Sequence, residues 1–170
     1  MLLDGHRTDR IHFRKLVESD FQLWLPFYLD PKSTEFWEGL PRDPVVACTE
    51  QFQRQFERYE KKIGGMNALI DIKSGELAGI CGLLLQEVEG KEEWEIGYSL
   101  MPQFRGKGYA TEAAQYCKSV AFENQLAPSL ISMIHVDNLP SQAVAERNGM
   151  NRDSEMIYKE NPIYIYRVWP

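Results

Sequence analysis

The chain has 170 residues, of which 44% are hydrophobic, 12% aromatic and 26% charged, and its net charge at pH 7 is −6. This length predicts one domain over residues 1–170, and the composition supports a buried core, which excludes a disordered, collagenous or coiled-coil protein. No apolar run approaches the ~20 residues that cross a bilayer, and the first residues lack the apolar segment of a signal peptide. We therefore expect a cytoplasmic protein whose acidic surface binds neither nucleic acid nor anionic membrane.

Cysteine and histidine are few and do not pair into a metal-site spacing. The three cysteines, Cys48, Cys81 and Cys117, are widely separated and stand in apolar stretches. An odd number without pairing predicts buried, reduced thiols. Structural zinc sites use closely spaced Cys and His ligands, so we expect no metal.

Hydrophobic periodicity and helix-start signals organise the first third of the chain. Asp43 followed by Pro44 is a favourable helix start, because aspartate caps free N–H groups and proline needs no donor in the first turn. The segment between the first two expected helices has no regular pattern and contains Phe36 and Trp37. The expected elements are a strand over 11–16, a helix over 19–29, a loop over 30–42, and a helix over 43–63 that stops at Gly64-Gly65.

The remainder alternates apolar runs with turn signals, and three strands follow one another without a helix between them. Such a run favours a mixed, mostly antiparallel sheet over a doubly wound parallel one. We predict an α+β fold with a twisted sheet of about six or seven strands flanked by helices. The expected elements are strands over 67–72, 77–85 and 92–101, a helix after residues 103–108, a strand over 130–136, a helix over 140–147, and strands at 157–158 and 163–169.

The segment Gln103-Phe104-Arg105-Gly106-Lys107-Gly108-Tyr109-Ala110 ends a strand and begins a helix. The first N–H groups of a helix lack internal partners and attract anions, and glycines without Cβ atoms let a phosphate approach the backbone. The alternative is a tight turn with solvated charges at positions 105 and 107. A dinucleotide fingerprint would need glycine where Thr111 stands, and no P-loop sequence is present, so both of those interpretations fail.

These residues resemble the GNAT superfamily of acetyl-CoA-dependent N-acetyltransferases, in particular the branch that acetylates ribosomal-protein N-termini and small amines. Gln103-x-x-Gly106-x-Gly108 matches the family's Q/R-x-x-G-x-G/A loop. The flanking sequences 95–100 and 109–113 fit the same motif, and segments 138–141 and 146–150 resemble the family's second motif. Together the matching segments cover roughly residues 77–150.

The resemblance implies a sheet with a V-shaped split between two central strands, here ending near Leu100 and Val136, and acetyl-CoA as co-substrate. It also implies that the coenzyme pyrophosphate binds the glycine loop, that the pantetheine arm pairs with the strand before it, and that Asn138 contacts the pantetheine or acetyl end. For Asn138 the alternative is a turn residue ahead of Pro140. The implied coenzyme-binding residues are Tyr98, Ser99, Leu100, Gln103, Arg105, Gly106, Lys107, Gly108, Tyr109, Ala110 and Asn138.

Acetyl transfer to an amine requires a base, and many relatives use a carboxylate near the split. We favour Glu95 over Glu93 and Glu92. Strand alternation places 93 and 95 on one face, although the bulge that is usual in this family would reverse the assignment. Solvated strand carboxylates are the alternative. His135 is a second candidate base by its chemistry, but on an apolar strand a buried core histidine is more common.

The family's usual acid, a tyrosine in the second motif, has no counterpart here, because Ala145 occupies its aligned position. Ser141, one helical turn earlier, is the substitute that we select to protonate the leaving thiolate. An ordinary polar residue in the first helical turn is the alternative for Ser141.

The acceptor is implied to be a primary amine, either a small molecule or a protein N-terminus, attacked directly in a ternary complex. Phe36 and Trp37 are predicted to shape the acceptor site, since long irregular connections are often functional. A non-catalytic acetyl-CoA-binding or regulatory module with the same fold is the competing hypothesis. The many tryptophans and tyrosines could serve the core or the interface of a homodimer.

Overall fold

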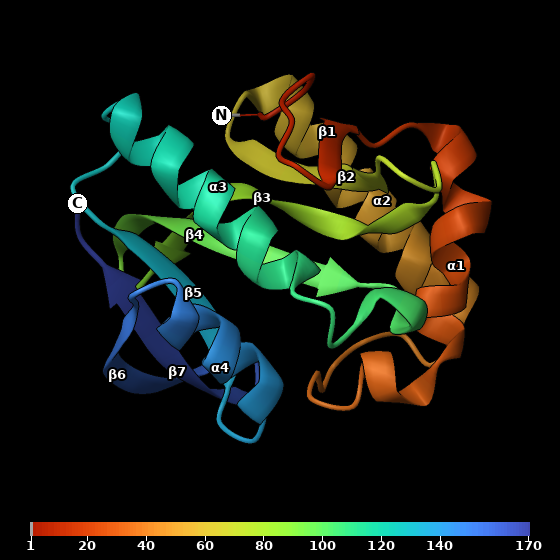
Figure 1. Cartoon of the computed structure of the whole chain (residues 1–170). Coiled ribbons are helices and arrows are strands. Elements are labelled where there is room, and N and C mark those ends of the chain that lie inside the picture. The colour runs from red at the N-terminus through yellow and green to blue at the C-terminus, as the bar shows by residue number, and fades with distance from the viewer. Residues whose placement is uncertain (1) are drawn as a thin grey trace.

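A seven-stranded sheet with helices on both faces forms the molecule (Figure 1). The computed structural model describes residues 2–170. The order of strands and α-helices agrees with the sequence-based prediction. The elements are β1 (Ile11–Lys15), α1 (Phe21–Leu29), α2 (Pro44–Lys61), β2 (Gly64–Asp71), β3 (Leu77–Val88), β4 (Lys91–Leu100), α3 (Tyr109–Glu123), β5 (Leu130–His135), α4 (Leu139–Arg147), β6 (Asn151–Tyr158) and β7 (Asn161–Val168).

The strands lie in the order β1-β2-β3-β4-β5-β7-β6. All neighbouring pairs are antiparallel except β4 and β5, which run parallel and share a single register pair, Glu95 with Ile131. Beyond that pair the two strands diverge toward Leu100 and His135 (Figure 1). The mixed, mostly antiparallel sheet with a V-shaped split is therefore confirmed.

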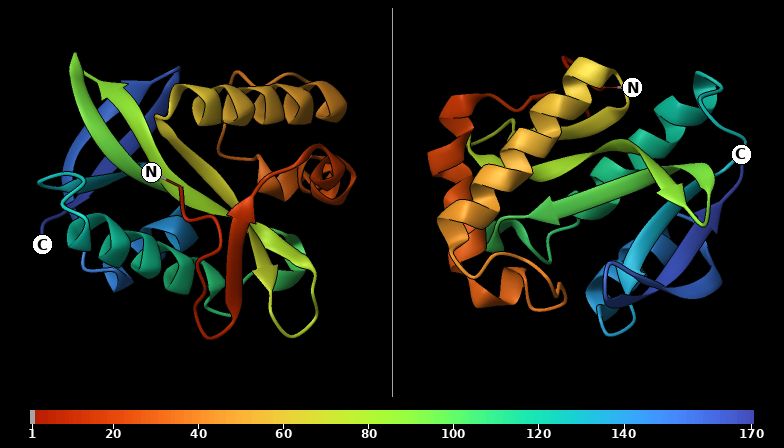
Figure 2. Two further views of the ribbon diagram at one scale, coloured as in Figure 1. Left: turned by 90° about the horizontal axis from the view of Figure 1, so that it is seen from above. Right: turned by 180° about the vertical axis from the view of Figure 1, so that it is seen from behind.

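Helices α1 and α2 cover one face of the sheet, and α3 and α4 cover the other (Figure 2). The small side chains of α3 let it lie close to the sheet, and Cys117 Sγ of α3 is 3.6 Å from Cys81 Sγ of β3. Cys48, Cys81 and Cys117 are all buried free thiols, as the sequence predicted. Burial raises the pKa of Cys48 to about 11, which favours the unreactive thiol form.

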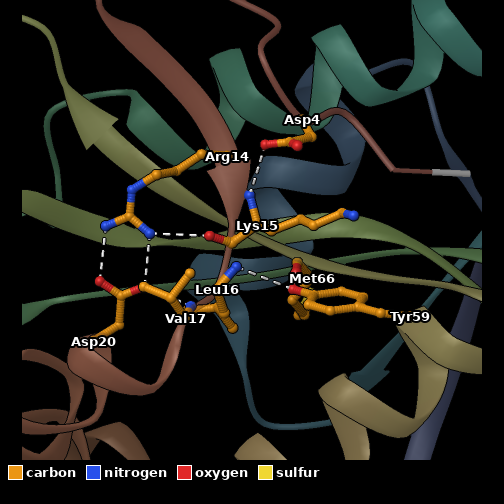
Figure 3. A network of polar contacts seen from close by, with 8 residues as sticks. All are labelled: Asp4, Arg14, Lys15, Leu16, Val17, Asp20, Tyr59 and Met66. Atoms are coloured by element: carbon orange, nitrogen blue, oxygen red, sulfur yellow. Dashed lines mark hydrogen bonds and ion pairs between the residues drawn. The ribbon is translucent and has the colours of Figure 1, made fainter.

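A hydrogen-bonded network joins β1 to the helices on the first face (Figure 3). Asp20 is almost completely buried, and its two carboxylate oxygens accept from Arg14 at 2.6 and 2.7 Å. The Tyr59 hydroxyl of α2 accepts from Leu16 N–H at 3.2 Å and donates to the Met66 carbonyl oxygen of β2. These contacts fix the start of α1 and the end of α2 relative to the β1 edge of the sheet.

Several predicted boundaries were wrong, among them the end of the strand expected over 77–85, which reaches Val88. Two of the differences have a clear physical reason. The second helix ends at Lys61, and Lys62 leaves it in the left-handed region with φ 57°. Gly64 opens β2 instead, because a Cβ at Gly64 would lie only 1.9 Å from the Leu83 carbonyl oxygen of β3. Strand β6 extends over Asn151–Tyr158 rather than 157–158 alone. It is an edge strand with mostly exposed side chains, so its first part carries no apolar alternation.

The described residues contain neither a membrane-spanning helix nor a metal cluster. No helix within 2–170 combines the length and apolar character that crossing a membrane requires. The same residues bring together no group of three or more His, Cys, Asp or Glu side chains that could hold a metal ion.

Candidate active site

The turn before α3 leaves the backbone donors at the start of this helix unoccupied. Gly106 and Gly108 adopt φ angles of 72° and 84°, in the left-handed region that favours glycine. Within residues 2–170, none of the backbone N–H groups of residues 106–110 donates a hydrogen bond. Free N–H groups at the positive end of a helix dipole can bind a phosphate.

The side chains of this segment divide between solvent and core. Gln103 and Lys107 are exposed, and Ala110 is half-buried in the first turn of α3. Tyr109 is buried, and its hydroxyl donates to Asp71 Oδ1 at 2.6 Å. This hydrogen bond holds the pKa of Asp71 below its ordinary value. The Tyr109 hydroxyl is thus occupied, so Tyr109 would contact a phosphate through its backbone N–H group.

Arg105 contacts the segment that follows α1. Its Nη1 donates to Asp30 Oδ2 at 3.1 Å, its Nη2 to Ser33 Oγ at 2.5 Å, and its Nε to the Leu100 carbonyl oxygen at 3.1 Å. The Arg105 side chain thereby links the end of β4 to the loop over 30–42. Its role as a coenzyme-binding residue stays a prediction.

Arg10 is a contact of the glycine turn that sequence reasoning missed. Its Nη1 donates to the Lys107 carbonyl oxygen at 2.8 Å, and its Nε donates to Glu112 Oε2 of α3 at 2.6 Å. The guanidinium also lies 4.5 Å from the centroid of the Tyr109 ring. Arg10 and Lys107 are 97 residues apart in the chain, so no local pattern could have indicated this contact.

Tyr98 connects β4 to the start of α4 across the split. Its hydroxyl donates to the Ser141 carbonyl oxygen at 2.9 Å and accepts from Ser141 Oγ at 3.1 Å. Burial raises the pKa of Tyr98, so the hydroxyl stays protonated. Ser99 and Leu100 follow Tyr98 on β4 and are half-buried. The hydroxyl of Ser141, the predicted acid, is therefore hydrogen-bonded to the hydroxyl of Tyr98, a contact that the sequence did not reveal.

Asn138 is the N-cap of α4. Its Oδ1 accepts from the Ser141 N–H at 3.1 Å, which satisfies one of the free donors at the helix start. Within the described residues its Nδ2 group has no acceptor. Asn138 therefore acts as a helix-start residue, which was the alternative to a ligand role. A contact with the pantetheine or acetyl end would use its Nδ2 group.

Glu95 lies at the apex of the split, where β4 makes its one register pair with β5. Its Oε2 accepts from Gln86 Nε2 at 2.7 Å, and the backbone N–H of Met133 on β5 is a further donor. Burial raises the pKa of Glu95 above its ordinary value, and these hydrogen bonds oppose the rise. A carboxylate with a raised pKa at the meeting point of two splayed strands is suited to accept a proton.

The other two carboxylates of β4 are placed differently. The register between β3 and β4 is continuous from Lys91 to Leu100, so the expected bulge is absent from this pairing and Glu93 shares a face with Glu95. Glu93 is held by Arg167 of β7, with both oxygens at 3.0 Å, whereas Glu92 is exposed.

The loop over 30–42 runs from the end of α1 to the strands β5 and β7, on the other side of the split from β4. The Phe36 ring stacks on His135 at the end of β5, with centroids 5.6 Å apart, and Trp37 is 42% exposed. Asn161 Oδ1 at the start of β7 accepts from the Glu38 N–H at 2.7 Å. Alternation along β5 places His135 on the face of Ile131, the register partner of Glu95. The predicted acceptor residues thus approach the face that carries the predicted base.

Replacing Gly108 with valine is expected to weaken acetyl-CoA binding at least tenfold, or ~1.4 kcal/mol. The φ of 84° disfavours any side chain, and a Cβ would lie 3.3 Å from Arg10 Nη2, so the free N–H groups would be displaced. Isothermal calorimetry measures the affinity. Gly75→Val is the matched control, because Gly75 has φ 75° but open space around it in the β2–β3 turn. Unchanged affinity in folded Gly108→Val protein would contradict the phosphate site.

Known proteins share both the sequence and the fold. Residues 10–151 match the model of the acetyltransferase (GNAT) domain. The Bacillus subtilis (strain 168) protein YkkB is 30% identical over 161 residues, which cover 94% of this chain and 92% of YkkB. An acetyltransferase from Agrobacterium tumefaciens str. C58 superposes with a TM-score of 0.82 at 28% identity, covering 97% of this chain and 94% of that one.

A third likeness concerns the fold alone. The ribosomal L7/L12 alpha-N-protein acetyltransferase RimL, solved in complex with coenzyme A, gives a TM-score of 0.76 at 18% identity and covers 97% of both chains. The family model spans most of the chain, and the relatives cover nearly all of it. The chain therefore belongs to the GNAT acetyltransferase family.

Proposed function

We propose that the protein transfers an acetyl group from acetyl-CoA to a primary amine by direct attack in a ternary complex. The observation that carries this proposal is the position of two different groups about one split. Free N–H groups at the start of α3 suit the coenzyme pyrophosphate, and Glu95 at the apex suits a base. RimL, a protein of the same fold, is described as bound to coenzyme A.

The proposed chemistry assigns each proton to a residue of the chain. The neutral amine nitrogen bonds to the thioester carbonyl carbon, and the carbon–sulfur bond breaks as the coenzyme leaves as a thiolate. Glu95 accepts the proton that the amine nitrogen loses, directly or through a water. The Ser141 hydroxyl, which donates to Tyr98 in the structure, donates or relays a proton to the thiolate and regains one from water, and Tyr98 positions it. Glu95 then returns to solvent the proton that it took from the amine. The Nδ2 group of Asn138 can donate to a carbonyl of the pantetheine arm.

Phe36 and Trp37 are proposed to contact the acceptor, which is a small amine or a protein N-terminus. Phe36→Ala and Trp37→Ala are expected to change the relative kcat/KM values of different amines while leaving acetyl-CoA affinity unchanged. The reason is that the Phe36 ring lies against His135 on the Glu95 face, whereas the coenzyme is proposed to bind the backbone N–H groups of residues 106–110. The measurement is kcat/KM over a set of small amines and peptides, with calorimetry of acetyl-CoA.

Trp169→Ala is the matched control for the loop variants. Trp169 is also exposed, at 56%, but lies beyond the end of β7. Its removal is expected to leave acceptor preference unchanged. Equal effects of the loop substitutions on all acceptors, or no effect, would contradict an acceptor site at this loop.

A non-catalytic acetyl-CoA-binding module is the second candidate function. Its specific support is Ala145, which is buried where the family's tyrosine acid is expected and offers no proton donor. The buried reduced thiols and the acetyl-CoA requirement agree with a cytoplasmic location under either function.

Initial-velocity kinetics test the proposed mechanism. Direct attack in a ternary complex predicts intersecting lines when acetyl-CoA and amine are varied together, and no acetyl label retained on the protein without amine. Parallel lines with a labelled protein would instead indicate an acetyl-enzyme intermediate and would overturn direct attack.

A further inference from the structure

Three side chains from three elements form a hydrogen-bonded row that ends at the predicted base. Arg58 Nη2 of α2 donates to Gln86 Oε1 of β3 at 2.8 Å, and Gln86 Nε2 donates to Glu95 Oε2 of β4 at 2.7 Å. Gln86 thus lies between a guanidinium and a carboxylate, with one end of its amide on each. Helix α2 is thereby connected to the apex of the split through a single side chain.

The guanidinium fixes which way the Gln86 amide faces. An arginine side chain only donates hydrogen bonds, so Gln86 has to present its carbonyl oxygen to Arg58. The NH₂ group is then directed at Glu95, where it can donate but cannot accept. A donor facing a carboxyl group favours the ionised carboxylate, which is the form that a base needs.

Arg58 is itself held in place by backbone oxygens. Its Nη1 donates to the Leu85 carbonyl oxygen at 3.0 Å and to the Ile63 carbonyl oxygen at 3.4 Å. These contacts span the end of α2 and the adjoining part of β3. The guanidinium therefore has a fixed position from which to orient Gln86.

Burial and nearby charges act on Glu95 in opposite directions. Burial raises its pKa, and the positive charges of Arg58 on α2 and Lys159 between β6 and β7 lower it. The Tyr98 hydroxyl on β4 also lies within the electrostatic reach of Glu95. Among these groups, Gln86 is the side chain that touches the carboxylate, and it is neutral.

We propose that Gln86 and Arg58 are positioning residues that hold Glu95 ionised and fixed in place at the apex of the split. This inference rests on the proposed function for the role of Glu95 as base. It assigns to α2 and β3 a part in the reaction, although neither residue is placed against the substrates.

The first test is the pH profile of kcat/KM in Gln86→Met. Methionine keeps the length of the side chain but removes the donor, so the acidic limb is expected to move upward by roughly half to one pH unit, with the plateau at higher pH largely retained. A residue that served only to pack the sheet would lower the melting temperature and leave the limb in place. An unmoved limb in folded Gln86→Met would overturn the proposal.

Variants of Arg58 test the order of the row. Arg58→Met alone is expected to move the acidic limb upward, as Gln86→Met does. The same Arg58→Met substitution made in Gln86→Met protein is expected to move the limb less, because Arg58 acts mainly through Gln86. Arg58→Lys retains a donor and is expected to restore most of the wild-type profile. Full additivity of the two methionine substitutions would contradict a row and leave two independent effects.

Glu93→Gln is the matched control. Glu93 lies on the same face of β4 but is held by Arg167, and removing its negative charge can only lower the pKa of Glu95 or leave it unchanged. An upward shift in Glu93→Gln as large as that in Gln86→Met would show that the limb reports general disturbance of β4, and would contradict the proposal.

A readout without catalysis separates this proposal from the function of Glu95. Carbon-13 NMR of glutamate side-chain carboxyl groups follows the titration of Glu95 directly, with Glu95→Gln used for assignment. If Glu95→Gln remains active, the role of Glu95 as base falls, yet an upward NMR pKa in Gln86→Met still supports the row. An NMR pKa that is the same in Gln86→Met and in wild type would overturn the row whatever the activity.

Discussion

Replacing Glu95 with glutamine is expected to lower kcat by about 10²- to 10⁴-fold, the range typical of a positioned proton-transfer group. Glutamine keeps the shape of the side chain but cannot take a proton from the amine. Acetyl-CoA affinity should change little, because the free N–H groups at the start of α3 do not involve Glu95. Steady-state kinetics with calorimetry of acetyl-CoA separates these two effects.

The role of Glu95 as base also predicts how the activity of the wild-type enzyme changes with pH. Burial raises the pKa of Glu95, so kcat/KM should fall as pH decreases through this raised pKa, because the protonated carboxyl cannot accept a proton. The part of the acidic limb that belongs to Glu95 should be absent in Glu95→Gln, whereas the part caused by protonation of the amine substrate should remain. Wild-type kcat in a folded Glu95→Gln protein would contradict the assignment of the base.

Ser141→Ala is expected to lower kcat by about 10²-fold, at the low end of the range for proton transfer, because a serine hydroxyl is a weak acid. Acetyl-CoA affinity should be nearly unchanged, since the contact with the thiolate forms mainly in the transition state. Tyr98 offers a hydroxyl beside Ser141, which further limits the loss.

Stability distinguishes this role from a structural one. Helix α4 is capped by Asn138, not by Ser141, so Ser141→Ala should leave the melting temperature close to that of the wild type. Asn138→Ala should destabilise the protein by about 0.5–2 kcal/mol through loss of the cap. A less stable Ser141→Ala protein with unaltered kcat would leave Ser141 as a helix-start residue only.

Much of the fold could be predicted because its signals are local. The apolar runs of β2 to β4, the Asp43-Pro44 start of α2 and the small-residue face of α3 all lie within short windows of sequence. The first part of β6 was missed because an exposed edge strand has no apolar alternation. The end of α2 was misplaced because Gly64 is required by close contact with β3, which sequence periodicity does not record.

The part of the candidate site that could be predicted from the sequence is the part formed by backbone groups. The glycine turn follows from the residues themselves, because glycine is the residue that most readily adopts the positive φ angles found at 106 and 108. The contacts of Arg10 with Lys107, of Arg105 with Asp30, and of Gln86 with Arg58 join residues distant in the chain. Such contacts depend on the order of strands in the sheet, so a single sequence contains no local pattern that predicts them.

Thiol release from acetyl-CoA is the most direct measurement of the proposed amine acetylation. The protein is incubated with acetyl-CoA and a panel of small amines and N-terminal peptides, and the free thiol and the acetylated amine are quantified together. The proposed function predicts thiol release that depends on an amine and matches the amount of acetylated product. Stabilisation of the protein by acetyl-CoA without thiol release on any acceptor would contradict catalysis and favour the binding module.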